Sequence, residues 1–347
     1  MAWTTTMEQM MFLRFIAGIG LGGVMPNTIS LNSELTPKKY RSALIVLMFM
    51  GITSGSTAMG LIAANYQAQY GWQILFHTGG ILPVVVAIGL YFFLPESLKL
   101  LATKKNRQTE LVRAARRMRR DLVVADDVEF INPPVVAESQ GNITELFKGG
   151  LKLITPLLWC CFGVALLGNF FLNTTLPLIY DKYGIAAEDA AYVATLYHAG
   201  GTLGGVVVVL LLDRLGFLTV FGLFALGIPS IILLGAQDAS VAFLGGMATL
   251  AGVAVLGAQF ANNAAAGLLY PTSIRGKGVG TALSIGRFGA IAGPYIGAAL
   301  LGLDITMQQL FLIAFTPFLI GLIAAAILSL LCYRRFKSFQ LDDTPVE

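Results

Sequence analysis

The sequence predicts an all-α polytopic membrane protein with nine transmembrane helices, and three observations lead to this fold class. Of the 347 residues, 56% are hydrophobic and only 12% are charged, and the mean hydropathy is +0.75. These values exclude an ordinary soluble domain and a disordered chain. Apolar runs near the roughly 20 residues that cross a bilayer recur along the whole chain. In lipid such runs must satisfy their own backbone hydrogen bonds, so they are expected to be helices.

Nine apolar segments follow one another along the chain. We expect the spans at 9–32, 42–66, 73–94, 153–177, 190–212, 217–235, 241–269, 279–302 and 308–332. Within these ranges only Arg14 and Arg287 carry a formal charge. A charge near mid-span costs about 2.5–3.5 kcal/mol on insertion scales, so each arginine must face a cavity, a partner or a helix neighbour.

The basic residues divide unequally between the two sides of the predicted spans. Of the 23 Lys and Arg residues, 20 fall in segments on one side, and Lys182 alone falls on the other. Basic residues concentrate on the cytoplasmic side of membrane proteins, so the C-terminus is expected in the cytoplasm.

A long polar segment divides the chain into two parts. We expect a partial first bundle at 1–101, a cytoplasmic linker at 102–150, a complete six-helix bundle at 151–337 and a cytoplasmic tail at 338–347. The linker carries five arginines within 109–121, which suits a surface helix beside the anionic inner leaflet. Blocks of like charge beside membrane spans usually set the orientation of the spans in the membrane, so no nucleic-acid partner is expected.

The first three and the last three segments share one layout. Spans begin at 42 and 279, and Asn27 aligns with Asn263 at an offset of 236. Parallel repeats of secondary transporters have this form. If the halves are equivalent, the middle three segments need three counterparts ahead of residue 9, which this sequence does not contain. We therefore expect a twelve-helix, two-bundle fold of which this chain carries nine helices.

Four motifs resemble those of the major facilitator superfamily. Arg14–Gly23 resembles the Arg-xxx-Gly motif of its fourth helix, and Glu34–Arg41 resembles the Glu-x6-Arg signature that follows. Leu94–Ser97 is similar to the ending of its sixth helix, and Asp213–Gly216 is similar to the second-half copy of its loop motif. The chain is identified as a member of this superfamily that lacks the first three helices.

Three further stretches are similar to the aromatic acid:proton symporters of that superfamily, namely Gly20–Asn27, Gly286–Gly289 and Gly293–Pro294. The resemblance implies proton-coupled uptake of an aromatic carboxylate of the benzoate or hydroxybenzoate type by alternating access. It also implies the inner membrane of a bacterium as the location, with a small organic anion and a proton as partners. We expect a monomer and no cofactor apart from the proton as coupling ion. Such symporters carry an acidic coupling element in helices one to three, which is not found here.

The polar residues of the spans indicate how such a substrate is held. Arg287 is expected to bind the carboxylate, because a guanidinium is always charged and presents a planar fork. The alternative is that Arg287 has a structural role and binds a carbonyl or carboxylate at a helix end. Amides at helical spacing and nearby aromatic rings can line one cavity, although interhelical hydrogen bonding and packing are the alternative. The further candidate ligands are Asn169, Asn173, Gln259, Asn262, Asn263, Tyr197 and Phe288.

A second set of residues is expected to couple or gate transport. Acidic and basic groups at matching cytoplasmic helix ends are expected to pair and separate as the halves rock. These are Glu34, Arg41, Asp213 and Arg275. The resemblance adds Arg14, which can instead snorkel outward, and His198 can accept a proton or serve in packing. Neither the three cysteines nor the two histidines have ligand spacing, so no metal site is expected.

Two other functions stay open. One is a major facilitator transporter of another small solute, such as a sugar, a drug or an aliphatic acid. The other is a truncated membrane protein that does not transport. An enzyme is not expected, because the spans contain no paired carboxylates, metal-ligand spacing or nucleophile-base set.

Overall fold

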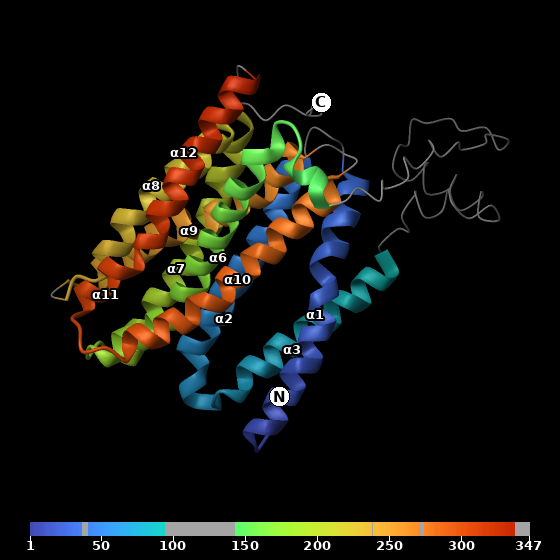
Figure 1. Ribbon diagram of the computed structural model, residues 1–347. Helices are drawn as coiled ribbons and strands as arrows, with labels where there is room; N and C mark the ends of the chain where they lie inside the picture. Colours follow the sequence, from blue (N-terminus) through green and yellow to red (C-terminus); the bar gives the residue numbers. More distant parts are fainter. Residues whose placement is uncertain (37–40, 94–142, 238, 271–273, 337–347) are drawn as a thin grey trace. The chain divides into compact units, whose positions relative to one another are not determined.

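The computed structural model describes residues 1–36, 41–93, 143–237, 239–270 and 274–336, and their regular elements are helices (Figure 1). In chain order these are α1 (Met7–Leu35), α2 (Arg41–Tyr70), α3 (Gln73–Phe93), the 3₁₀ helix η2 (Ile143–Phe147), α6 (Leu151–Lys182), α7 (Ala187–Leu215), α8 (Phe217–Leu233), α9 (Val241–Leu269), α10 (Arg275–Leu301), α11 (Met307–Ala314) and α12 (Thr316–Phe336). The predicted all-α class is confirmed.

The predicted segments coincide with these helices, and the last segment is divided between α11 and α12. Pro317 has no N–H to donate to the preceding turn, which favours a break at this point. The Thr316 hydroxyl donates instead to the carbonyl of Ile313 at 2.7 Å. Among the described residues, six spans are long and apolar enough to cross a membrane, in α2, α3, α6, α7, α9 and the α11–α12 pair. The number of nine spans stays a prediction.

The helices group into two compact units. The first comprises Met1–Ile45 and Asn65–Glu138, and the second comprises Val46–Ala64 and Ser139–Glu347. In the first unit Trp3 lies edge-on to His77, with ring centroids 5.5 Å apart. Of the predicted linker, 102–142 lies outside the described residues, together with its arginine-rich segment. The predicted domain boundaries stay predictions.

Two helix pairs of the second unit pack at backbone distance. Helix α7 lies against α9, and α6 lies alongside α10 (Figure 1). A side chain at Gly252 of α9 would collide with the backbone carbonyl of Tyr197, and one at Gly289 of α10 would collide with the carbonyl of Gly163. Small residues at helix contacts are the usual means of close approach in membranes, where packing and hydrogen bonds drive association.

The middle of α2 also packs within the second unit. Phe49 is buried and stacks on Phe260 of α9, with ring centroids 6.0 Å apart. The buried Thr53 shares a hydrogen bond of 2.9 Å with the hydroxyl of Thr202 on α7. This part of α2 is therefore fixed by both an apolar and a polar contact.

Hydrogen bonds tie the two ends of the second unit. Beyond the C-terminus of α10, Lys182 Nζ donates to the carbonyls of Leu301 at 2.8 Å and Leu303 at 3.0 Å, where a cation is favourable. At the other end Thr155 donates to the carbonyl of Leu146 at 2.7 Å, which joins α6 to η2. Tyr270 donates to Thr155 at 3.4 Å, and burial raises the pKa of Tyr270, which favours the protonated donor.

Candidate functional site

Three polar side chains from three helices of the second unit form one hydrogen-bonded group, in which Asn169 and Tyr197 are buried and Gln259 is half-buried. Asn169 of α6 donates from Nδ2 to Oε1 of Gln259 on α9 at 3.0 Å. The hydroxyl of Tyr197 on α7 donates to Oδ1 of Asn169 at 3.2 Å. Tyr197 is 1% exposed and Asn169 is 9% exposed. The structure thus brings together three predicted ligands, which are called the amide–tyrosine triad below.

The glycines of α7 and α9 help to position this triad. Gly200 and Gly252 let the two backbones approach closely, because any side chain at either position would collide with the backbone of the other helix. Tyr197 lies one turn before Gly200, so its ring enters the bundle at this close contact. The ring of His198 lies edge-on to that of Tyr197, with centroids 5.4 Å apart. His198 is therefore a half-buried titratable group beside the triad.

Asn262 lies one helical turn beyond Gln259 on α9 and is fully enclosed. It is 0% exposed, and neither Oδ1 nor Nδ2 forms a hydrogen bond with any described residue. Among the described residues, Trp159 and Thr219 each leave one buried polar atom in the same condition. A buried polar group without a partner costs about 1–3 kcal/mol. Asn262 is distinguished from the other two because both ends of its amide are affected.

The remaining predicted ligands lie outside the triad. Asn263 is half-buried on α9, and Asn173 is exposed on α6, one turn from Asn169. Phe288 on α10 is 68% exposed. Helical spacing predicted a shared face for Asn169 and Asn173, but the buried face of α6 continues from Asn169 through Leu172 and Leu176, and Asn173 lies outside it.

Arg287 lies on the face of α10 that does not pack against α6. Gly286 and Gly289 on either side of it approach Phe162 and Gly163 of α6, so the helix contact uses the glycine face. The Arg287 side chain is exposed, as is Tyr295 two turns further on. Arg287 is therefore not part of the contact between α10 and α6.

The structure describes the side chains of only some of the predicted coupling residues. Arg14 is exposed on α1, and Asp213 is exposed near the end of α7. Glu34 lies in α1, and Arg41 and Arg275 begin α2 and α10, but the side chains of these three lie outside the described part. The pairing of these charges stays a prediction.

One polar contact was missed by the sequence analysis. Ser54 of α2 lies 3.3 Å from the Thr202 hydroxyl, beside the bond between Thr53 and Thr202. The run Ile52–Gly60 is rich in Ser, Thr and Gly, and this composition was the available signal for a polar helix contact.

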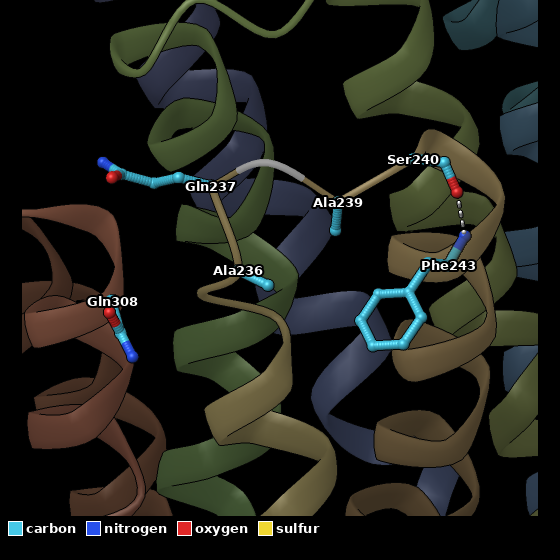
Figure 2. A pocket seen from close by; sticks show the side chains of 6 residues that line it. All are labelled: Ala236, Gln237, Ala239, Ser240, Phe243 and Gln308. Carbon is cyan, nitrogen blue, oxygen red and sulfur yellow. Dashed lines mark hydrogen bonds between the residues drawn. The ribbon is translucent and has the colours of Figure 1, made fainter.

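An open pocket of about 600 Å³ lies at the loop between α8 and α9. Its lining consists of Ala236, Gln237, Ala239, Ser240, Phe243 and Gln308 (Figure 2). Ser240 already accepts the N–H of Phe243 at 3.3 Å as the N-cap of α9. No charged side chain is among these described lining residues, so they offer nothing that would neutralise a carboxylate. Among the described residues, no cluster of His, Cys, Asp or Glu could hold a metal ion.

Comparison with known proteins identifies transporters. Residues 1–296 match the family model described as sugar (and other) transporter. The chain is 35% identical to the 4-hydroxybenzoate transporter PcaK of Pseudomonas putida, over 91% of this chain and 71% of that protein. For PcaK of Pseudomonas aeruginosa the identity is 37%, over 89% and 69%. The benzoate transport protein of Acinetobacter baylyi is 31% identical, over 94% and 70%.

A solved structure of the major facilitator proton:xylose symporter XylE resembles the chain with a TM-score of 0.61. The similarity covers 94% of this chain and 71% of that one, at 16% sequence identity. At this level of identity the likeness concerns the fold alone, and it agrees with the predicted bundle of transporter helices.

Proposed function

Since the chain belongs to the sugar (and other) transporter family of the major facilitator superfamily, we propose that it takes up an aromatic carboxylate by alternating access. The observation that supports this substrate class is the identity of 35% and 37% to two 4-hydroxybenzoate transporters over about nine tenths of the chain. The family and these relatives are transporters, so the chain is not an enzyme, as the sequence predicted. We place it in a bacterial inner membrane as a monomer, with the C-terminus in the cytoplasm.

Two kinds of polar group are available for such a substrate. Arg287 is exposed and positively charged, and a guanidinium pairs with a carboxylate through two parallel hydrogen bonds. We assign the carboxylate to Arg287. The amide–tyrosine triad is neutral and suits the uncharged polar parts of a ligand or of bound water. Phe288 next to Arg287 offers an exposed ring for stacking on the aromatic substrate. Asn173 and Asn263 complete the proposed set.

Uptake is proposed to be driven by a proton. His198 is the titratable group that lies beside the triad, with its ring 5.4 Å from that of Tyr197. A histidine changes charge near neutral pH, so its protonation can alter the local hydrogen bonding. Arg14, together with the pairing of Glu34, Arg41, Asp213 and Arg275, completes the proposed coupling set.

Uptake of labelled 4-hydroxybenzoate into proteoliposomes under an inward proton gradient tests this function. The wild-type chain is expected to accumulate the acid, and a protonophore is expected to abolish accumulation. Arg287→Ala is expected to lower uptake by about tenfold or more, since losing a charge-assisted bond costs roughly 1.5–3 kcal/mol. Arg287→Lys keeps the charge but loses the planar fork of the guanidinium. Its uptake is expected to lie between that of the wild type and that of Arg287→Ala.

Other outcomes would contradict separate parts of the proposal. Wild-type uptake by Arg287→Ala would show that Arg287 does not bind the carboxylate. A solute panel that includes a sugar, a drug and an aliphatic acid tests the substrate class, because accumulation of one of these in place of aromatic acids would overturn it. Accumulation of no solute would favour a protein that does not transport.

A further inference from the structure

The enclosed amide of Asn262 is not explained by the stability of the fold. Gln259 and Asn262 lie on one face of α9, because residues three apart are neighbours on a helix. Gln259 is hydrogen-bonded to Asn169, whereas both amide atoms of Asn262 lack a partner among the described residues. A buried donor or acceptor without a partner costs about 1–3 kcal/mol, a cost that an apolar side chain of similar size would not have. A polar residue kept at such a cost is a candidate for pairing with a ligand in another state.

The surroundings of Asn262 limit the chemistry of that ligand. On α9 its neighbours within one turn include Ala258, Ala261, Ala265 and Ala266, each 0% exposed, and Gln259, whose Oε1 accepts from Asn169. None of them is charged, so they provide no ion pair, and the alanine side chains provide no hydrogen bond. A charged group would be costly here, and a neutral polar group would not.

The amide itself favours a hydroxyl over a carboxylate. It presents one acceptor oxygen and two donor hydrogens, whereas an ionised carboxylate only accepts. A phenolic hydroxyl both donates and accepts, so it can satisfy Oδ1 and Nδ2 of Asn262 together. The neighbouring triad is less available, because Asn169 already uses Nδ2 for Gln259 and Oδ1 for Tyr197.

We propose that Asn262 binds the ring hydroxyl of a hydroxylated aromatic acid and so sets a preference for hydroxybenzoate over benzoate. This inference rests on the proposed function, and it adds the group that distinguishes members of the substrate class. In the structure the position is closed to solvent, so binding there requires the helices that enclose Asn262 to move apart. A site that hydrogen-bonds a substrate hydroxyl discriminates strongly against the analogue without it, since its own polar group is then left unpaired.

Binding of 4-hydroxybenzoate and of benzoate to the purified chain in lipid nanodiscs tests the inference by calorimetry. Asn262→Leu is expected to weaken 4-hydroxybenzoate binding by about tenfold or more and to change benzoate binding less than about twofold. Asn262→Ser, which keeps a hydroxyl, is expected to recover part of the preference. The matched control is Ser230→Ala on α8, because Ser230 is buried and donates to the carbonyl of Leu226 within its own helix. Its ratio of affinities is expected to equal that of the wild type.

The result separates this inference from the proposed function. If the wild type binds and takes up both acids and Asn262→Leu keeps their ratio, or weakens both equally, Asn262 does not bind the hydroxyl and only the inference is wrong. If the wild type binds neither acid, the proposed function is wrong and the inference is overturned with it. Asn262→Leu is expected to melt at or above the wild-type temperature, since it removes an unpaired buried amide. If that variant does not fold, Asn262→Ser provides the same comparison of the two acids.

Discussion

Helices α9 and α10 place their polar residues in opposite ways. Helix α9 keeps two amides within the second unit, because Gln259 is half-buried and bonded to Asn169, and Asn262 is fully enclosed. Helix α10 turns its glycines toward α6 and leaves Arg287 and Tyr295 exposed. The difference follows from charge, because burial of a neutral amide costs about 1–3 kcal/mol even without a partner, whereas burial of a guanidinium without a carboxylate is far more costly.

Because of this contrast, the polar residues of α9 and α10 are accessible to different binding partners. Asn262 of α9 responds only to a change inside the second unit, since it has no access to the surface. Arg287 is available to a ligand or partner that approaches from outside the unit. The same face of α10 also exposes Phe288, Ile291 and Tyr295. An arginine in such an apolar face is unfavourable in hydrocarbon, so a cavity, a partner or the membrane interface is required there.

The largest effect is expected from Gly289→Val, which tests whether the glycine face of α10 is the packed one. The new side chain would collide with the carbonyl of Gly163, a backbone atom that cannot move away alone. Overpacking of this kind costs about 1–3 kcal/mol or more, so the thermal unfolding temperature in detergent is expected to fall sharply. Gly280→Val on the same helix is the matched control, because nothing lies within 4 Å of its new Cβ. Equal melting of the two variants would contradict the packing of α10 on α6 through this face.

A smaller loss of stability is expected from Asn169→Leu, which tests the hydrogen bonds that hold the amide–tyrosine triad together. The substitution removes both hydrogen bonds of the triad and leaves Gln259 and Tyr197 without their partner. Interhelical hydrogen bonds in membranes contribute on average about 0.6 kcal/mol each, so a loss of roughly 1–2 kcal/mol is expected in equilibrium unfolding. Tyr197→Phe removes one of the two bonds and is expected to cost about half as much. An equal loss in both variants would show that the bond between Asn169 and Gln259 contributes nothing.

The helices were predictable because long apolar runs determine where helices lie in a membrane protein. The segment predicted at 153–177 lies within α6, and that predicted at 241–269 has the bounds of α9. Helical spacing also placed Gln259 and Asn262 on one face of α9. It did not predict that one amide is paired and the other is not, because this depends on which side chains of α6 and α7 reach that face.

The orientation of Arg287 depended on a signal in the sequence that was not used for this purpose. Gly286, Gly289 and Gly293 recur at helical spacing, and such a stripe indicates the face that packs against another helix. Arg287 does not lie on this stripe, so its exposure follows from the glycines. The contact between Thr53 and Thr202 was beyond this reasoning, because the two residues are 149 positions apart.

The smallest effect on stability is expected from Arg287→Gln. No hydrogen bond or ion pair joins Arg287 to another described residue, and its side chain is exposed, so unfolding is expected to change by less than about 0.5 kcal/mol. Glutamine is chosen because it removes the charge and keeps a polar side chain. Thermal unfolding of this variant, measured beside Asn169→Leu, decides between the two interpretations of Arg287. A loss as large as that of Asn169→Leu would favour a structural tie, whereas unchanged stability together with lost uptake would favour a ligand for the carboxylate.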